Sequence, residues 1–278
     1  MSKIIFLALV LFIQLSSSGQ NSHLTYYSAI DSAQQSMKAK EYSLAIEQYE
    51  KARNELGFLS TTSLNQALKA AKKTKNEDLE NKYDELIEEQ KNSIDESYQS
   101  FIDSLYQLDQ EVRNGKSIKA VRYVDMAKTL PPSQVDSTKL IESQLIVENW
   151  QKTDSLNTKA LIKAINEKGF PSEARVGPKG LNQAITILIH FGLIPTEANF
   201  HSILKEALYK GELPPFYYAY IIDCQRVRFS EKQLYCQYLP YFFERLTEEE
   251  KQIVVQNRHG IGLYKGSYTY GGKTMEIR

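Results

Sequence analysis

Three groups of polar residues in the second half of the chain have the types and spacing that acid–base chemistry needs. Asp109 and Arg113 are four residues apart, and Asp154 and Asn157 are three apart, so each pair shares one face if its segment is helical. His190 ends the apolar stretch LNQAITILIH, where a polar ring needs either a partner or a function. We therefore expect the three groups to converge under partial burial, with His190 contacting Asp154 or Asn157.

Each of these observations also has a structural explanation that the sequence leaves open. A buried histidine is often held by a carbonyl or carboxylate group and has no further role. Charged residues three or four apart on a helix commonly form solvent-exposed ion pairs. A catalytic set of His190, Asp154 and Asp223, in which a carboxylate orients His190 as a general base, therefore competes with a purely structural network.

The sequence lacks the motifs of common metal- and nucleotide-dependent enzymes. Residues 266–274, GSYTYGGKT, resemble a phosphate-binding loop, but the first glycine is one residue too far from the Gly-Lys-Thr group and no strand–loop–helix unit surrounds it. There is no Gly-x-Ser-x-Gly nucleophile elbow and no His-Glu-x-x-His pair. We expect no metal and no cofactor, and a tyrosine-rich hairpin at this end of the chain.

The elements that must position the polar residues are helices. A long helix is predicted from about 135 to 168. Its expected buried side consists of Leu140, Leu145, Trp150, Leu161 and Ile165. The next stretch, NEKGFPSEARVG, contains Gly169, which can end that helix in a left-handed turn, then Pro171 and Gly177, which fix a second turn. This loop would set the distance between the helix of Asp154 and the helix that ends at His190.

The N-terminal part has a helical pattern that repeats. AKEYSLAIEQYEKA resembles the second helix of a tetratricopeptide repeat. Small and aromatic positions of that family fall on Ala33, Ala45, Tyr49 and Ala52, and one period of 34 residues later on Ala67, Leu79, Tyr83 and Leu86. Two repeats need a neighbour to cover their last apolar face, so we expect a long bridging helix that ends near Asn114.

The first 19 residues are typical of a secretory signal peptide. Lys3 precedes an unbroken apolar run from Ile4 to Ile13, and small polar residues follow. A retained anchor is the weaker alternative because the run is about half of the ~20 residues that cross a bilayer. Removal of Lys3 with this segment leaves 33 basic and 34 acidic residues, a near-neutral balance that argues against a nucleic-acid partner. We expect a periplasmic or secreted protein with no membrane span after cleavage.

Cys224 and Cys236 are the two cysteines of the chain. The β-favouring runs RVRF and QLYCQYL flank Ser-Glu-Lys, which predicts a β-hairpin over about 226–238. Such a hairpin would place Cys224 across from Cys236, and in an exported protein two cysteines can pair. We therefore expect a disulfide between them.

A family resemblance covers residues 102–278. The segments LDQEVR, TDSLNTKALIKAINEKGFPSEARVG, AITILIH, ILKEALYKGELPPFYYAYIIDC and KQLYCQ are together similar to a bacterial domain family of unknown function, numbered 6624, found in exported proteins. Its recurring polar residues fall on Asp109, Gln110, Arg113, Asp154, Asn157, His190, Asp223 and Gln233. The resemblance implies candidate residues but no reaction, and this chain departs from the family at Cys224 and Cys236.

Taken together, the sequence predicts a mainly α protein. Residues 1–19 form the signal peptide, 20–101 the tetratricopeptide-like hairpins with the bridging helix, and 102–278 an α-rich domain with a small β-hairpin. We expect a binding or scaffolding module with a protein or peptide partner, in which Asp109, Gln110, Arg113, Asn157 and Gln233 bind. The alternative is a metal-independent hydrolase with a site around His190, which clustered rather than dispersed polar side chains would favour.

Overall fold

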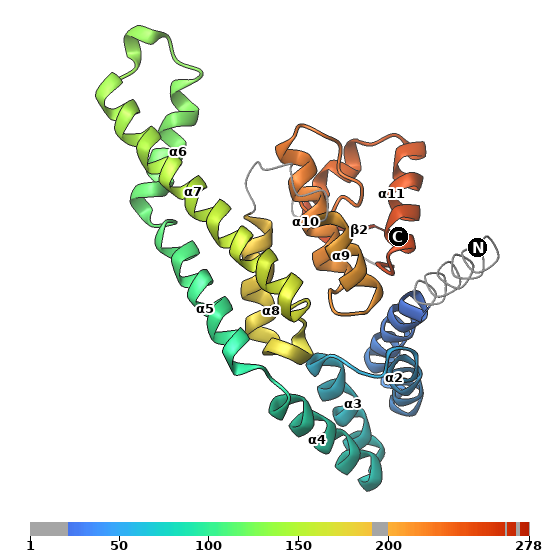
Figure 1. Ribbon diagram of the computed structural model, residues 1–278. Helices are drawn as coiled ribbons and strands as arrows, with labels where there is room; N and C mark the ends of the chain where they lie inside the picture. The colour runs from blue at the N-terminus through green and yellow to red at the C-terminus, as the bar shows by residue number, and fades with distance from the viewer. Residues whose placement is uncertain (1–21, 191–199, 265, 271–272, 278) are drawn as a thin grey trace, which may run out of the picture.

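The computed structural model describes residues 22–190, 200–264, 266–270 and 273–277. The predicted signal peptide lies outside these residues. The described chain is mainly α-helical and has one small two-stranded sheet near its C-terminal end (Figure 1). This confirms the predicted fold class. None of the described helices combines the length and the apolar composition needed to span a membrane.

The N-terminal part consists of antiparallel helices around their own core. The helices are residues 22–39, α2 (Tyr42–Leu56), α3 (Thr61–Thr74) and α4 (Glu77–Asn92). Two of the four pairs of positions 34 residues apart are buried alike, since Ala33 and Ala67 are fully buried and Tyr49 and Tyr83 are at most 1% exposed. In the other two pairs the alanine is fully buried and the later leucine is half-buried. The small residues let neighbouring helices approach closely while the tyrosine rings fill the space between them. The resemblance to tetratricopeptide repeats itself stays a prediction.

The predicted bridging helix is wrong, because the chain breaks between α4 and α5 (Glu96–Glu111). Asp95 caps α5 by accepting a 2.9 Å hydrogen bond from the backbone N–H of Tyr98, and its own N–H donates to the carbonyl of Arg175 at 2.8 Å. Buried Ile87 and Tyr98 are separated by about three helical turns. The spacing of apolar residues is therefore the same as in one continuous helix, and it gives no sign of the break. Tyr98 is not part of the N-terminal core and is buried in a second hydrophobic core.

The second core is built around α8 (Glu173–Ile189), which packs against α5, α7 and α10. Its other helices are α7 (Ser137–Lys168), α9 (Phe200–Tyr209) and α10 (Pro215–Arg228). Leu161 and Ile165 are buried in this core as predicted. In Figure 1, α5 and α7 lie on one side of α8 and the C-terminal helices on the other.

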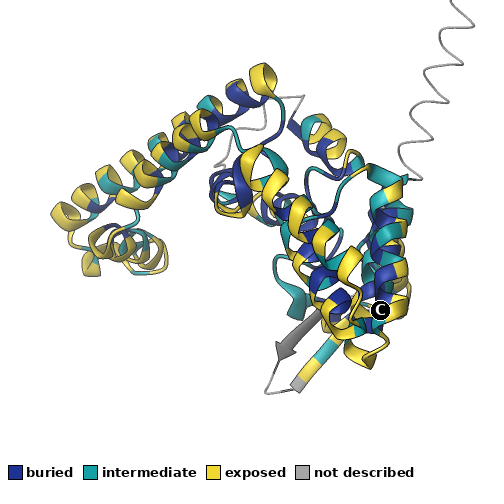
Figure 2. Ribbon diagram, turned by 90° about the horizontal axis from the view of Figure 1, so that it is seen from below, coloured by how far each residue is buried: buried dark blue, intermediate teal, exposed yellow. Residues whose placement is uncertain are grey.

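A helical arm projects from this core, formed by α6 (Gly115–Ala127) and the first half of α7 (Figures 1 and 2). Its buried residues are small, namely Ser117, Ala120 and Ser143. Leu145 was predicted to be buried and is 60% exposed. The prediction fails because, of the helices that the structure describes, α6 alone covers this half of α7, so a helical apolar pattern here does not face a core.

The hairpin predicted over 226–238 is also wrong. α10 continues to Arg228, and no strand occurs between 229 and 238. The strands are β1 (Gly266–Tyr270) and β2 (Lys273–Ile277), which pair antiparallel, as expected for the chain end. Between these regions lie the 3-10 helix η2 (Pro240–Arg245) and α11 (Glu248–Gly260), which begins with a capping box of Thr247 and Glu250.

The predicted disulfide is absent, since both cysteines are free. Cys224 lies in α10, and Cys236 lies in the irregular segment that replaces the hairpin, with a left-handed φ of 48°. The two predictions fail together, because the disulfide depended on the hairpin to bring the cysteines opposite each other.

Candidate functional site

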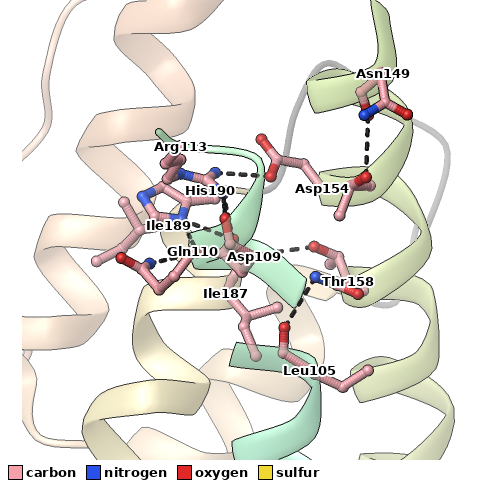
Figure 3. A network of polar contacts seen from close by, with 12 residues as sticks. Leu105, Asp109, Gln110, Arg113, Asn149, Asp154, Thr158, Ile187, Ile189 and His190 are labelled. Atoms are coloured by element: carbon pink, nitrogen blue, oxygen red, sulfur yellow. Dashed lines mark hydrogen bonds and ion pairs between the residues drawn. The ribbon is translucent and has the colours of Figure 1, made fainter. Parts of the chain in front are cut away.

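Four of the predicted polar residues converge where α5, α7 and α8 meet. Nδ1 of His190 lies 3.0 Å from Oδ1 and 3.1 Å from Oδ2 of Asp109. The guanidinium of Arg113 contacts the carboxylates of Asp109 and Asp154, each at 2.7 Å. Figure 3 shows Arg113 between the two carboxylates and His190 reaching Asp109 from the end of α8. We call these four residues the His190 network.

Burial differs along this network. The side chain of Asp109 is fully buried, those of Asp154 and Arg113 are 10% and 12% exposed, and that of His190 is 26% exposed. The imidazole is therefore the part of the network most accessible from outside. Within the described part of the chain, nothing is hydrogen-bonded to Nε2 of His190.

Further contacts hold Asp109 and Arg113 in place. Nε2 of Gln110 donates to Oδ2 of Asp109 at 2.7 Å, and Nη1 of Arg113 also donates to the carbonyl of Asp109 at 2.6 Å. The Arg113 guanidinium carbon lies 5.0 Å from the centre of the Trp150 ring, close enough for a cation–π contact. Trp150 was expected only as a core residue, and its packing against Arg113 had no sequence signal.

Local sequence explains how each helix delivers its side chain. Asp109 and Arg113 occupy the last turn of α5 and the residues after it, one helical turn apart. His190 is the C-cap of α8, so its ring extends from the end of that helix and reaches Asp109 of α5. Asp154 lies in the middle of α7, where burial raises the pKa of its carboxyl above the ordinary value although Arg113 opposes this change.

The loop between α7 and α8 is built on two glycines. Gly169 has φ 85° and ψ 172°, and Gly177 has φ 71° and ψ 169°. Both combinations fall in a region that is essentially restricted to glycine. The positive φ of Gly169 was expected, but its ψ is extended rather than left-handed helical. Gly177 kinks α8 near its start, which aims the rest of the helix toward Asp109.

The predicted partners of His190 were wrong, although Asp109 and Arg113 approach it as expected. His190 contacts Asp109 and not Asp154 or Asn157. The side chain of Asn157 instead donates from Nδ2 to the carbonyl of Leu105 at 3.0 Å, which ties α7 to α5. Asp154 reaches the network only through Arg113.

Asp223 and Gln233 bind the segment after α10, and neither is hydrogen-bonded to the His190 network within the described residues. The carboxylate of Asp223 accepts backbone hydrogen bonds from Leu234, Tyr235 and Gln237, at 2.7 to 3.1 Å. Gln233 exchanges two hydrogen bonds with the backbone of Leu239. Asp223 therefore does not orient His190, and these bonds occupy backbone groups that the predicted hairpin would have used. Burial raises the pKa of Asp223.

Arg258 is a structural residue that the sequence interpretation missed. It is 1% exposed, and its Nη1 donates to the carbonyl of Tyr235 and to Oε1 of Gln237, at 3.0 and 3.1 Å. Burial lowers the pKa of its guanidinium to about 10. A lone arginine near the end of a polar helix carries no pattern that distinguishes it from a surface residue.

Comparisons with known proteins add no assignment: no protein-family model, curated protein or solved structure matches this chain. Within the described residues, no three His, Cys, Asp or Glu side chains are grouped as metal ligands would be. An imidazole with Nδ1 held by a carboxylate and a free Nε2 is arranged to accept and return a proton.

Proposed function

We propose that the protein is an exported, metal-independent hydrolase-like enzyme in which His190 acts as a general base. The observation that carries this proposal is the contact between Nδ1 of His190 and the buried carboxylate of Asp109. This contact favours the tautomer with the proton on Nδ1, which leaves Nε2 as the acceptor.

The roles of the other residues follow from their contacts. Asp109 orients the imidazole and stabilises the positive charge that forms when Nε2 takes a proton from water. Arg113 and Gln110 fix Asp109, and Asp154 fixes Arg113 from the opposite side. His190 is the catalytic candidate, whereas Asp109, Arg113 and Asp154 are positioning residues.

The test is a screen of chromogenic carboxylic, phosphoric and glycosidic esters, followed by kinetics of His190→Gln. We expect kcat/KM to fall by about 10² to 10⁴, the usual contribution of a general base, with the melting temperature within a few degrees of wild type. His201→Gln is the matched control, because Nε2 of His201 contacts Oε1 of Gln225 at 3.0 Å, outside the network. A wild-type chain with no turnover in any class, or full activity in His190→Gln, would contradict the proposal.

A second candidate function is peptide binding, favoured by a groove of about 820 Å³ between the N-terminal helices and the α8 region. Aromatic side chains of Tyr26, Tyr27, Phe58 and Tyr217 line this groove, together with charged residues of both signs. Helical-repeat surfaces typically bind extended or helical peptides in such a place.

Selection of peptides from a displayed library tests this second candidate. Lys210 lines the groove and is paired with Glu206 at its exposed edge. A selected acidic peptide should lose affinity about tenfold on Lys210→Glu, whose charge reversal repels it. The same peptide should bind His190→Gln normally. Selection of no peptide, or loss of binding with His190→Gln instead, argues against the groove.

A further inference from the structure

A second pocket is lined in part by the segment that Asp223 organises. Its volume is about 790 Å³, within the range of small-molecule sites. It is formed by the end of α10, the segment 230–236, η2 and α11. We call it the α11 pocket. Its apolar lining consists of Val227, Leu234, Phe242, Leu246, Ile253 and Val254.

The polar side chains of the α11 pocket are nearly all satisfied by the protein itself. Arg226 pairs with Glu231 at 3.0 Å, and Lys232 pairs with Glu250 at 2.7 Å. The amides of Gln233 and Asn257 bind backbone groups. A peptide in this pocket would leave its own N–H and C=O groups without partners against apolar walls, which is unfavourable.

Arg245 is the exception. No acidic side chain among the described residues pairs with it, although it lines the pocket. Its guanidinium carbon lies 5.1 Å from the ring centre of Phe242 and 5.6 Å from that of Tyr241, and these two rings stack at 4.8 Å. The aromatic pair holds the cation at the pocket edge without neutralising it. The lining is left with one positive charge.

We propose that the α11 pocket binds an amphiphilic monocarboxylate, that is, an alkyl chain that ends in one carboxylate. The chain would lie against the apolar lining, which includes the half-exposed Ile253, and the carboxylate would accept hydrogen bonds from Arg245. An alkyl chain has no polar groups to satisfy, and a single negative charge matches Arg245, the one lining cation that no acidic side chain of the described residues neutralises. This proposal is independent of the His190 network.

Isothermal titration of the purified chain with dodecanoate, below its micelle concentration, tests the proposal. We expect one site per chain, with affinity falling about fourfold for each methylene removed in the series to octanoate. Arg245→Gln should weaken dodecanoate at least about tenfold and leave dodecan-1-ol unchanged, because only the carboxylate uses the guanidinium. Ile253→Asp should weaken both ligands, and it should fold because the residue is 50% exposed.

Arg122→Gln is the matched control, since Arg122 is an exposed arginine of α6. It should bind dodecanoate like wild type, and so should His190→Gln, which separates this proposal from the proposed enzyme. Equal dodecanoate binding to wild type, Arg245→Gln and Ile253→Asp would show non-specific adsorption and overturn the proposal. Binding of dodecyl phosphate in preference to dodecanoate, or of a peptide with a free C-terminus instead, would also overturn it.

Discussion

Asp109 is the residue on which the His190 network depends most. It is fully buried and accepts hydrogen bonds or ion pairs from Gln110, Arg113 and His190. A buried carboxylate is tolerated only when its partners replace the water that it loses. Removal of the carboxylate therefore affects three other side chains at once.

We predict that Asp109→Ala lowers the free energy of unfolding by about 2–4 kcal/mol, because Arg113 and Gln110 lose a buried partner. Urea unfolding followed by circular dichroism measures this change. Asp125→Ala is the control, since Asp125 is 65% exposed where it pairs with Lys128. This substitution should lower the free energy of unfolding by less than about 1 kcal/mol. Equal effects of the two substitutions would mean that the network adds no stability.

The cysteines give a second prediction for single residues. Cys224 and Cys236 are 1% and 2% exposed, and burial raises the pKa of both thiols, that of Cys236 to about 12. Since the thiolate is the reactive form, neither should react with Ellman's reagent at about pH 8 while the chain is folded. Two thiols per chain should react in guanidinium chloride without reductant. Fewer than two reactive thiols per chain would indicate a disulfide between Cys224 and Cys236, which the structure does not contain.

Among the elements, the α7–α8 loop positions His190 through two glycines in conformations that other residues avoid. Gly177→Ala should destabilise the protein by about 1–3 kcal/mol, since its φ is 71° and an added Cβ would lie 3.2 Å from Cδ1 of Ile94. Gly115→Ala, at the open first turn of α6, should instead stabilise by about 0.4–1 kcal/mol. Thermal unfolding of both variants checks this pair, and a stabilising Gly177→Ala would exclude backbone strain as the reason for the kink.

At the scale of the whole molecule, the two cores are joined by close contacts between distant segments. Ser93 donates to the carbonyl of Ala174, and Tyr264 donates to that of Leu24. Gly211, after α9, faces the N-terminal part so closely that a Cβ there would lie 2.5 Å from Cδ1 of Leu56. The two parts can therefore approach this closely because Gly211 has no side chain.

We predict that Gly211→Ala destabilises the chain by about 1–3 kcal/mol more than Gly57→Ala does. Both glycines have a positive φ, 71° and 78°, so both variants share the backbone penalty. The added Cβ at Gly57 meets nothing within 4 Å, so the difference measures the contact between the two parts. Matched denaturation curves for the two variants would show that this contact is loose in solution.

Much of the fold was predictable because it depends on neighbours along the chain. The Thr247 capping box and the turns at the glycines around α8 depend on residues a few positions away, and the 34-residue spacing of small and aromatic positions can be counted directly along the chain. The sharing of one helix face by Asp109 and Arg113 is equally local, because it follows from the helical repeat. The convergence of the polar groups near His190 could be predicted on a different ground, because buried polar groups need one another as partners.

The remaining features depend on partners that lie far away in the sequence. His190 meets Asp109 because of the way α8 packs against α5, which no residue spacing expresses. The segment 229–238 favours β structure locally, but Asp223 binds its backbone N–H groups and prevents strand pairing. Leu145 has a core-like spacing and stays 60% exposed, because α6 alone among the described helices packs on that half of α7. An apolar spacing or a local propensity favours burial or a strand at these positions. The contacts with residues distant in the sequence decide whether that structure forms.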